Sequence, residues 1–389
     1  MHTDPVLFTV FLIFTGAAVL ATVALFAHQA LLVAYILVGI LCGPWGLGLV
    51  VDPVLIQKIA HIGIMFLLFL LGLNLHPQKL WKLLRQTTLV TGASSLVFAL
   101  LGMMIGWLFR FTVLESLLIG AVFMFSSTII GLKLLPTTVL HHQRMGEVMI
   151  SVLLLQDLLA VLVIMLLRIQ NTADTGLFDL AFALLSLPGL FLLAFLLERY
   201  VLIWLIRRFE KIQEYIFLVA IGWCLGMAEL AVRVELSSEI GAFIAGIALA
   251  ASPISLFISE TLRPLRDFFL VMFFFSLGAS FNLQTLPEVF LPAMLLAALA
   301  VGLKPLVFLA LFRYAGEPLA RALEMGVRLG QVSEFAFLIA VLAVELAIIS
   351  PRASALIQTG ALLSFIVSPY LIVLRFPTPI ALSDRLRRN

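Results

Sequence analysis

The sequence predicts an all-α polytopic membrane protein, and three observations support this prediction. Of 389 residues, 63% are hydrophobic and only 12% are charged, with a mean hydropathy of +1.19; a soluble domain carries about 25% charged residues. Apolar runs of about 20 residues, the length of a membrane-spanning helix, recur along the whole chain. Basic residues gather in alternate loops between these runs, as they do in multi-span proteins.

Reading the apolar runs between polar or Pro/Gly breaks gives about 13 transmembrane helices. The first run, Pro5–Ala27, is too long for the hydrophobic region of a cleavable signal peptide. The second is short and ends in the helix-breaking sequence GPWG at 43–46. The spans are expected at residues 4–27, 29–45, 54–75, 80–108, 112–138, 144–168, 177–206, 212–232, 236–251, 256–280, 286–312, 319–346 and 352–376.

The distribution of Lys and Arg predicts the orientation of the chain in its membrane. One set of loops, with the C-terminal tail, holds Lys79, Lys82, Arg85, Arg144, Arg207, Arg208, Lys211, Arg263, Arg266, Arg313, Arg321, Arg375, Arg385, Arg387 and Arg388. The opposite set holds only Arg110, Arg168, Arg233 and Arg352, with Lys58 just inside its helix. Because cytoplasmic loops carry the excess of basic residues, we expect the N-terminus outside and the C-terminus in the cytoplasm.

The span count favours two inverted six-helix repeats within one transmembrane domain, residues 1–376. Repeat one would cover about 1–168, a connector helix about 177–206 and repeat two about 212–376, followed by a short basic tail at 377–389. An even number of spans per half plus one connector places the halves in opposite orientation, as in many secondary transporters. Polar interruptions in the fifth span of each half favour the same arrangement.

Asp157 lies in the middle of the predicted span 144–168, among leucines and other apolar residues. A carboxylate at the bilayer centre costs about 3 kcal/mol or more, so such residues face a water-filled cavity, pair with a cation or bind a proton. We therefore interpret Asp157 as a group that handles monovalent ions; a buried, hydrogen-bonded acid without a transport role is the alternative. The adjacent Gln156 offers an acceptor and donors that would flank the same cavity.

Three adjacent hydroxyls, at Ser126, Ser127 and Thr128, lie at mid-depth of the predicted span 112–138. They cannot all lie on one face of an intact helix. Either they bond back to carbonyl groups of their own helix, or the helix is broken and its freed carbonyls and hydroxyls coordinate a cation. The residues alone leave both interpretations open.

The span 319–346 also gathers polar residues, from Arg328 to Glu334. Arg328 is too far from Glu334 for an i,i+4 pair in an intact helix, so either the helix is broken or the partner lies elsewhere. In a broken helix, Glu334 would neutralise the positive N-terminal end of a half-helix.

Two lysines lie within predicted spans. Lys304 either extends to the interface or pairs with an acid, and Asp157 is the expected partner. Lys133 would meet the negative end of its own half-helix or extend to the cytoplasmic interface.

The sequence gives no support for other classes of protein. The sequence contains no phosphate-binding glycine loop, zinc-ligand spacing or specific Ser/His/Asp arrangement, so we expect neither enzyme activity nor a cofactor. The net charge of +3 is small and spread over loops, which gives no indication of nucleic-acid binding. Cys42 and Cys224 lie far apart in apolar runs and are expected as free thiols.

Four segments resemble, in order and spacing, the Kef-type potassium efflux systems within the second family of monovalent cation:proton antiporters. They are Gly43–Val50 (GPWGLGLV), Leu70–Trp81 (LLGLNLHPQKLW), Leu154–Ala160 (LLQDLLA) and Leu329–Phe337 (LGQVSEFAF). The resemblance covers nearly the whole chain. It implies a 13-helix, sodium/proton antiporter-like fold with a dimerisation domain, hence a homodimer, and a core domain in which spans 112–138 and 319–346 are crossed broken helices.

The resemblance also implies that Asp157 binds a cation or a proton in turn. Sodium antiporters of the wider superfamily often carry two adjacent acids at this place, whereas this chain has Gln156 first, as Kef-type systems do. That difference favours potassium. Kef systems carry a C-terminal regulatory domain, whereas only a short tail is expected after residue 376 here. Glutathione regulation is therefore not carried over, and a separate regulatory subunit is a candidate partner.

The expected function is therefore exchange of K⁺ or Na⁺ for H⁺ in a lipid membrane by alternating access, with K⁺ favoured. The ion site is expected at Asp157, Gln156, Ser126, Ser127 and Thr128, with charge compensation by Lys304, Glu334, Lys133 and Arg328. A sodium/proton antiporter on the same scaffold is the first alternative. A gated potassium channel is the second, although no filter sequence of the Thr-Val-Gly-Tyr-Gly kind is present; an organic-anion symporter would need a basic pocket.

Overall fold

The computed structural model describes residues 5–27, 29–50, 53–74, 77–133, 144–170, 177–209, 212–234, 236, 238–250, 252 and 254–378, which form helices joined by short turns. The α-helices are α1 (Pro5–Phe26), α2 (Leu31–Cys42), α3 (Pro53–Asn74), α4 (Pro77–Leu108), α5 (Val113–Phe123), α6 (Thr128–Lys133), α8 (Arg144–Gln170), α9 (Leu177–Leu197), α10 (Ile203–Arg208), α11 (Gln213–Arg233), α12 (Ser238–Ala250), α13 (Ser255–Thr261), α14 (Arg263–Ala279), α15 (Leu286–Ala298), α16 (Lys304–Tyr314), α17 (Leu319–Arg328), α18 (Phe335–Glu345) and α19 (Pro351–Arg375). Two π-helical segments, η1 (Glu198–Leu202) and η3 (Leu299–Leu303), and the 3-10 turn η2 (Leu283–Thr285) adjoin them.

Each predicted span coincides with one helix or with consecutive helices, so the all-helical, polytopic fold is confirmed. Within the described ranges, seven helices are long and apolar enough to cross a membrane, and five shorter apolar helices accompany them. The spans expected at 112–138 and 319–346 are both interrupted, by residues 124–127 between α5 and α6 and by residues 329–334 between α17 and α18. The two broken helices expected from the resemblance are therefore present.

The chain divides into two compact units, each of which draws segments from both halves of the sequence. The first unit comprises Met1–Ile13, Val50–Leu80 and Met165–Ser276; the second comprises Phe14–Leu49, Trp81–Ile164 and Leu277–Asn389. Both interrupted helices, and α8 up to Ile164, belong to the second unit.

In the first unit, α3 packs along α12, and α11 packs against both. Gly72 and Gly246 lie at the α3–α12 crossing, where a Cβ on either residue would collide with backbone of the other helix, at Phe243 and Phe69 respectively. Small residues that let helix backbones approach closely are typical of packing inside membranes. Cys224 is buried in this unit, and both it and Cys42 are free thiols, as expected.

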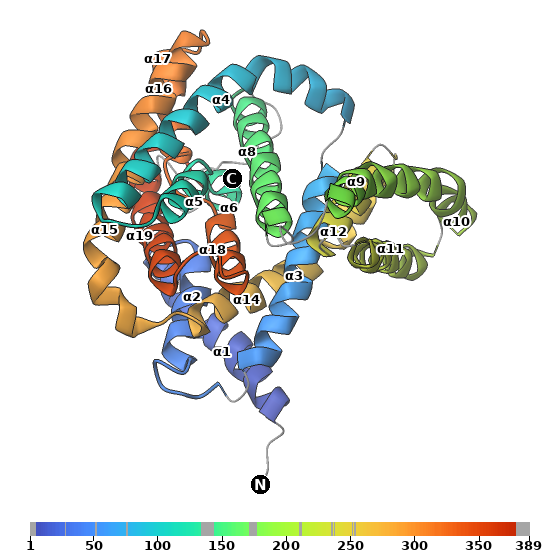
Figure 1. Cartoon of the computed structure of the whole chain (residues 1–389), viewed down its shortest axis with the longest axis horizontal. Coiled ribbons are helices and arrows are strands. Elements are labelled where there is room, and N and C mark those ends of the chain that lie inside the picture. The colour runs from blue at the N-terminus through green and yellow to red at the C-terminus, as the bar shows by residue number, and fades with distance from the viewer. Residues whose placement is uncertain are drawn as a thin grey trace. The chain divides into compact units, whose positions relative to one another are not determined.

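In the second unit, α15 packs on α19 and α16 on α17, while α5 lies beside α18 and α19 (Figure 1). Pro305 has no N–H to offer the preceding turn, and the backbone just before it widens into the π-helix η3. Gly330 fits against this proline, since an added Cβ would come 2.7 Å from the Pro305 Cγ atom. This packing brings the α17–α18 break next to the start of α16.

A buried acid ties two helices of this unit together at their first turns. Glu115 forms a capping box with Thr112 at the start of α5, accepting the Thr112 N–H at 2.9 Å. Its other carboxylate oxygen accepts the N–H of Ser350, the N-cap of α19, at 3.0 Å. Helix N-termini favour carboxylates, so one acid stabilises the start of both helices.

Candidate functional site

The two breaks lie against each other in the interior of the second unit. α5 ends at Phe123 and α6 begins at Thr128, while α17 ends at Arg328 and α18 begins at Phe335. The Ser126 hydroxyl donates a hydrogen bond of 2.8 Å to the Leu329 carbonyl oxygen, which joins one break to the other. Both residues are fully buried, so this contact is made away from bulk water.

Gln156 of α8 braces the first break through both ends of its side-chain amide. Its Oε1 accepts the N–H of Ser126 at 3.0 Å, and its Nε2 donates to the Met124 carbonyl oxygen at 3.1 Å. Backbone groups left without helical partners must be satisfied when buried. The Gln156 amide is thus engaged by the backbone of the break, whereas the sequence analysis expected it to face the ion.

The three adjacent hydroxyls of the first break have three different partners. Ser126 bonds to the other break, as described above. Ser127 caps α6, its oxygen accepting the Ile130 N–H at 3.1 Å. Thr128 donates to the Asp157 Oδ2 atom at 3.0 Å. The helix is therefore broken at this segment, and of its three hydroxyls the one of Thr128 bonds to the acid; coordination of a cation here stays a prediction.

Asp157 combines full burial with an unsatisfied oxygen. Its side chain is 1% exposed, and its Oδ1 atom is buried without a hydrogen-bond partner among the described residues. Glu334, at the second break, lies close enough to interact electrostatically with Asp157. A buried acceptor of this kind requires an explanation, and a bound proton or cation would satisfy it.

The second break is braced by neutral groups of α19. Ser364 accepts the Val332 N–H at 3.2 Å, and Ser368 donates to the Gln331 Oε1 atom at 3.0 Å. The Gln331 Nε2 atom donates to the carbonyl oxygens of Arg328, at 2.8 Å, and Ser127, at 3.3 Å. Gln331 therefore holds its own break and also contacts the first one.

Lys304 does not pair with Asp157, which corrects the expectation from sequence. Its buried Nζ atom donates to the carbonyl oxygens of Phe125, at 3.0 Å, and Gln331, at 3.2 Å, one in each break. The rings of Phe98 and Phe123 lie 4.9 and 5.3 Å from the same nitrogen. Carbonyl groups freed by the breaks carry the negative ends of the backbone dipoles, so they take the place of the carboxylate.

The remaining charged residues have separate positions. Arg328, fully buried at the C-terminal end of α17, pairs with Glu324 one turn earlier (2.7 Å) and also donates to the Pro377 carbonyl oxygen (2.8 Å). Glu334 directly precedes α18, at the positive end of that half-helix, and its side chain makes no capping hydrogen bond. The side chain of Lys133 lies outside the part of the chain that the structure describes.

Sequence reasoning overlooked the side chains that brace the second break. Ser364 and Ser368 are spaced i,i+4 on α19, and this spacing was the available signal. Gln331 was visible within the polar segment of its span. The partner of Arg328 is Glu324, one turn earlier in the same helix, and the i,i+4 spacing of the two residues was the available signal.

Comparison with known proteins identifies the family of this chain. The family described as the transmembrane sodium/hydrogen exchangers matches residues 10–373. The glutathione-regulated potassium-efflux system proteins KefC of Salmonella arizonae and Salmonella typhi are each 31% identical over 371 residues, which is 93% of this chain. The chain spans 59% of the length of these relatives.

Among solved structures, the sodium proton antiporter MjNhaP1 of Methanocaldococcus jannaschii at pH 8 has the same fold, with a TM-score of 0.69 at 16% identity. The likeness covers 93% of this chain and 94% of that one. An electron-microscopy map of the same antiporter gives a TM-score of 0.68. The family match extends over both interrupted helices and the acid between them, and the chain belongs to the sodium/hydrogen exchanger family of transmembrane proteins.

Proposed function

We propose that this chain exchanges a monovalent cation, K⁺ in preference to Na⁺, for protons across a bacterial inner membrane. The observation that carries the proposal is the Asp157 Oδ1 atom, which is buried beside the broken helix without a hydrogen-bond partner among the described residues. A permanently charged carboxylate in this position would be costly, whereas one neutralised by a proton or by a cation is not.

The mechanism is competition for one carboxylate. A proton on Asp157 leaves towards the more alkaline side, and a partly dehydrated cation then takes its place. The cation receives oxygen ligands from Asp157 and from the Thr128 hydroxyl, which lies 3.0 Å from the carboxylate. Because proton and cation occupy the same group in turn, movement of one is coupled to opposite movement of the other.

Gln156, Ser126 and Ser127 act in this scheme by holding the first break open. Their bonds to Met124, Leu329 and Ile130 keep the segment non-helical next to Asp157. Irregular backbone at membrane depth is tolerated where it is buried in protein or lines a cavity. These three side chains are therefore supports for the ion site, and Asp157 and Thr128 are its ligands.

The surrounding charges set the electrostatic balance of the site. Lys304 places a positive charge between the two breaks, and Glu334 places a carboxylate near Asp157. Arg328 and Lys133 complete the expected compensating set. With one exchanging carboxylate, the simplest stoichiometry is about one proton per cation, without net charge movement. If Lys304 also releases a proton during the cycle, this ratio changes.

The preference for K⁺ rests on the sequence relatives. The proteins at 31% identity are named as potassium-efflux systems, and the segment that holds Gln156 and Asp157 is one of those in which the sequence resembles Kef-type systems. The solved structures that share the fold are of a sodium proton antiporter, at 16% identity. Na⁺ is therefore the alternative cation on the same scaffold.

Alternating access would move the second unit, as the core, relative to the first in a homodimer. The N-terminus would lie outside and the C-terminus in the cytoplasm. Two contacts support this orientation. Arg144 and Arg321, both predicted to be cytoplasmic, share the carboxylate of Glu317, whereas Arg352, predicted to be external, lies over the ring of Phe111, beside the external Arg110. A separate regulatory subunit remains a candidate partner.

The test is proton movement in proteoliposomes loaded with acidic buffer. Addition of K⁺ to the outside is expected to drive protons out of vesicles that hold the wild-type chain, and Na⁺ to do so less well. Asp157→Asn is expected to abolish the response. Glu345→Gln, which removes an exposed acid at the end of α18, serves as the matched control and is expected to retain it.

Retained exchange in the Asp157→Asn variant would rule out the assignment. Potassium flux that proceeds without a proton gradient and leaves the internal pH unchanged would indicate a channel. A larger response to Na⁺ than to K⁺ would support the same mechanism with Na⁺ as the transported cation.

A further inference from the structure

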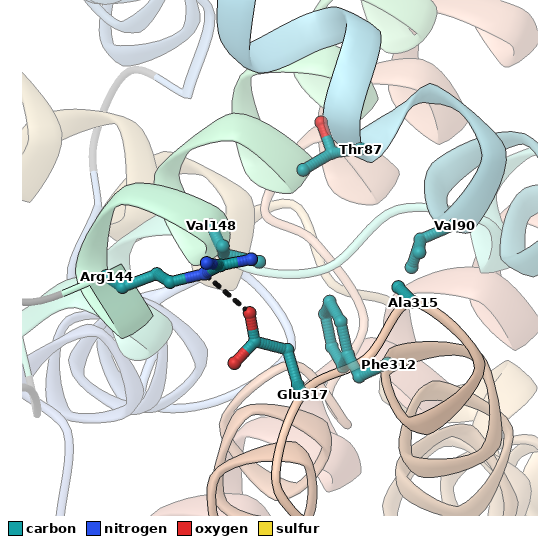
Figure 2. A pocket seen from close by; sticks show the side chains of 7 residues that line it. All are labelled: Thr87, Val90, Arg144, Val148, Phe312, Ala315 and Glu317. Atoms are coloured by element: carbon teal, nitrogen blue, oxygen red, sulfur yellow. Dashed lines mark hydrogen bonds and ion pairs between the residues drawn. The ribbon is translucent and has the colours of Figure 1, made fainter.

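The second unit contains a pocket at the end where α8 begins and α16 turns into α17. The cavity has a volume of about 290 Å³ and is lined by residues of α4, α8 and the α16–α17 corner: Thr87, Val90, Arg144, Val148, Phe312, Ala315 and Glu317. Figure 2 shows Arg144 and Glu317 joined across one side of it, with Phe312 and Val90 beside Ala315. The pocket lies far along α8 from Asp157, so it is separate from the proposed ion site.

One buried residue at this pocket, Glu317, holds two arginines through its carboxylate and a third through its backbone carbonyl oxygen. Glu317 is 3% exposed, and its Oε1 and Oε2 atoms each lie 2.9 Å from a guanidinium nitrogen, of Arg144 and of Arg321 respectively. Arg313 donates to the backbone carbonyl oxygen of the same residue at 3.0 Å. Three positive charges thus surround one negative charge, and Glu147, exposed in the same turn of α8 as Arg144, does not line the cavity.

This arrangement suits an anion and does not suit a cation. Both oxygens of Glu317 already have arginine partners, so the pocket offers no open carboxylate ligand. The Arg144 side chain is 67% exposed, and among the described residues only its Nε atom is engaged. Its terminal nitrogens remain available, and guanidinium groups bind phosphate oxygens with two parallel hydrogen bonds.

We propose that this pocket binds a phosphate group through Arg144, with Val148 and Phe312 against the apolar atoms attached to it. The phosphate belongs either to the headgroup of an anionic lipid or to a small soluble phosphate. Basic pockets between helices near the cytoplasmic side of a membrane bind lipid headgroups in this way. The bound group would connect α4, α8 and the α16–α17 corner, and it would stabilise the second unit whichever cation the chain transports.

Thermal unfolding of the purified chain in neutral detergent tests the site without any transport assay. Short-chain phosphatidylglycerol is compared with short-chain phosphatidylcholine, and inorganic phosphate with chloride at equal ionic strength. A ligand that binds only the folded chain raises the unfolding midpoint, and the rise grows with the logarithm of its concentration above its dissociation constant. Stabilisation by phosphatidylglycerol alone identifies the lipid as the source; stabilisation by inorganic phosphate identifies a soluble one.

Two variants test whether the stabilisation arises from binding in this pocket. Arg144→Gln removes the guanidinium proposed to contact the phosphate while Arg321 still pairs with Glu317, and Val148→Phe fills the cavity while every arginine stays. Each is expected to weaken the apparent affinity about tenfold or more, as for loss of a charge-assisted contact. Arg233→Gln, which removes an arginine 73% exposed and paired with Glu229 in the first unit, is the control and keeps wild-type affinity. Equal stabilisation of wild type and Arg144→Gln, or no stabilisation by either phosphate source, overturns the proposal.

Discussion

The break between α5 and α6 and the break between α17 and α18 expose the same kinds of backbone group, but the helices that brace them use different chemistry. α8 meets the first break with an amide and a carboxylate, Gln156 and Asp157. α19 meets the second with two hydroxyls, Ser364 and Ser368. Both breaks are held open by side-chain hydrogen bonds. Of the two supporting helices α8 and α19, only α8 carries an acid with a buried oxygen that has no hydrogen-bond partner among the described residues. Holding a helix open is therefore separable, in this fold, from the ion binding that we propose at Asp157.

Replacing the side chains of α8 and α19 that face the breaks, one at a time, should give the largest loss of exchange at Asp157. Asp157→Asn should reduce cation-driven proton exchange at least about 100-fold, which corresponds to about 2.7 kcal/mol, because an amide cannot alternate between proton and cation. Initial rates in proteoliposomes measure this loss. An Asp157→Asn variant that keeps more than a tenth of the wild-type exchange rate would show that the acid does not give α8 a role different from that of α19.

Gln156→Leu should destabilise the chain most among the neutral replacements at the breaks. It leaves the Ser126 N–H and the Met124 carbonyl oxygen unpaired, and each buried unpaired group costs about 1–3 kcal/mol. The midpoint of thermal unfolding in detergent reports the change. Gln358→Leu is the matched control, because the Gln358 amide donates only to the Ser354 hydroxyl and leaves no backbone group unpaired. Equal midpoints for these two variants would show that Gln156 does not support the break.

Thr128→Val should weaken cation binding while the fold stays intact. The substitution keeps the shape of the side chain and removes the one hydroxyl that bonds to Asp157. A hydrogen bond to a charged group contributes about 1.5–3 kcal/mol, so the half-saturating cation concentration should rise about tenfold or more. Thr128→Ser restores the hydroxyl and should restore the affinity. If the valine and serine variants behave alike, the hydroxyl is not a ligand.

The smallest effect is expected at the second break. Ser364→Ala deprives the Val332 N–H of its acceptor and should cost about 1 kcal/mol of stability. Exchange rates should fall by no more than about threefold, since no group at Asp157 is altered. A loss of exchange as large as that of Asp157→Asn would mean that the two breaks contribute equally to ion binding.

Sequence patterns predicted the spans because these depend on local composition, and apolar runs of membrane length are visible without a structure. The hydroxyls at 126–128 and Gly-Gln-Ser at 330–333 marked the two places where a helix could be interrupted, but the residues alone left an intact helix open, and the breaks themselves were expected from the resemblance. Asp157, like the spans, was identifiable from local composition, as a carboxylate in the middle of a hydrophobic helix.

The partners of the charged residues could not be predicted in this way. Lys304 bonds to the carbonyl oxygens of Phe125 and Gln331, and a carbonyl oxygen carries no signature of residue type in the sequence. The contact between Glu115 and Ser350 joins residues 235 positions apart, so it depends on how the helices pack. From sequence alone, a buried lysine is paired with the nearest acid. In this fold, the carbonyl oxygens at the free ends of broken helices compete with that acid for the lysine.

The most direct test of the account measures protons released when a cation binds to the purified chain. In weakly buffered detergent solution at a pH where Asp157 is protonated, addition of K⁺ should release about one proton per bound cation, because binding of a metal ion to a protonated ligand displaces the proton. The Asp157→Asn variant should release none. Cation binding without proton release in the wild-type chain, or unchanged release in the variant, would contradict exchange at this carboxylate.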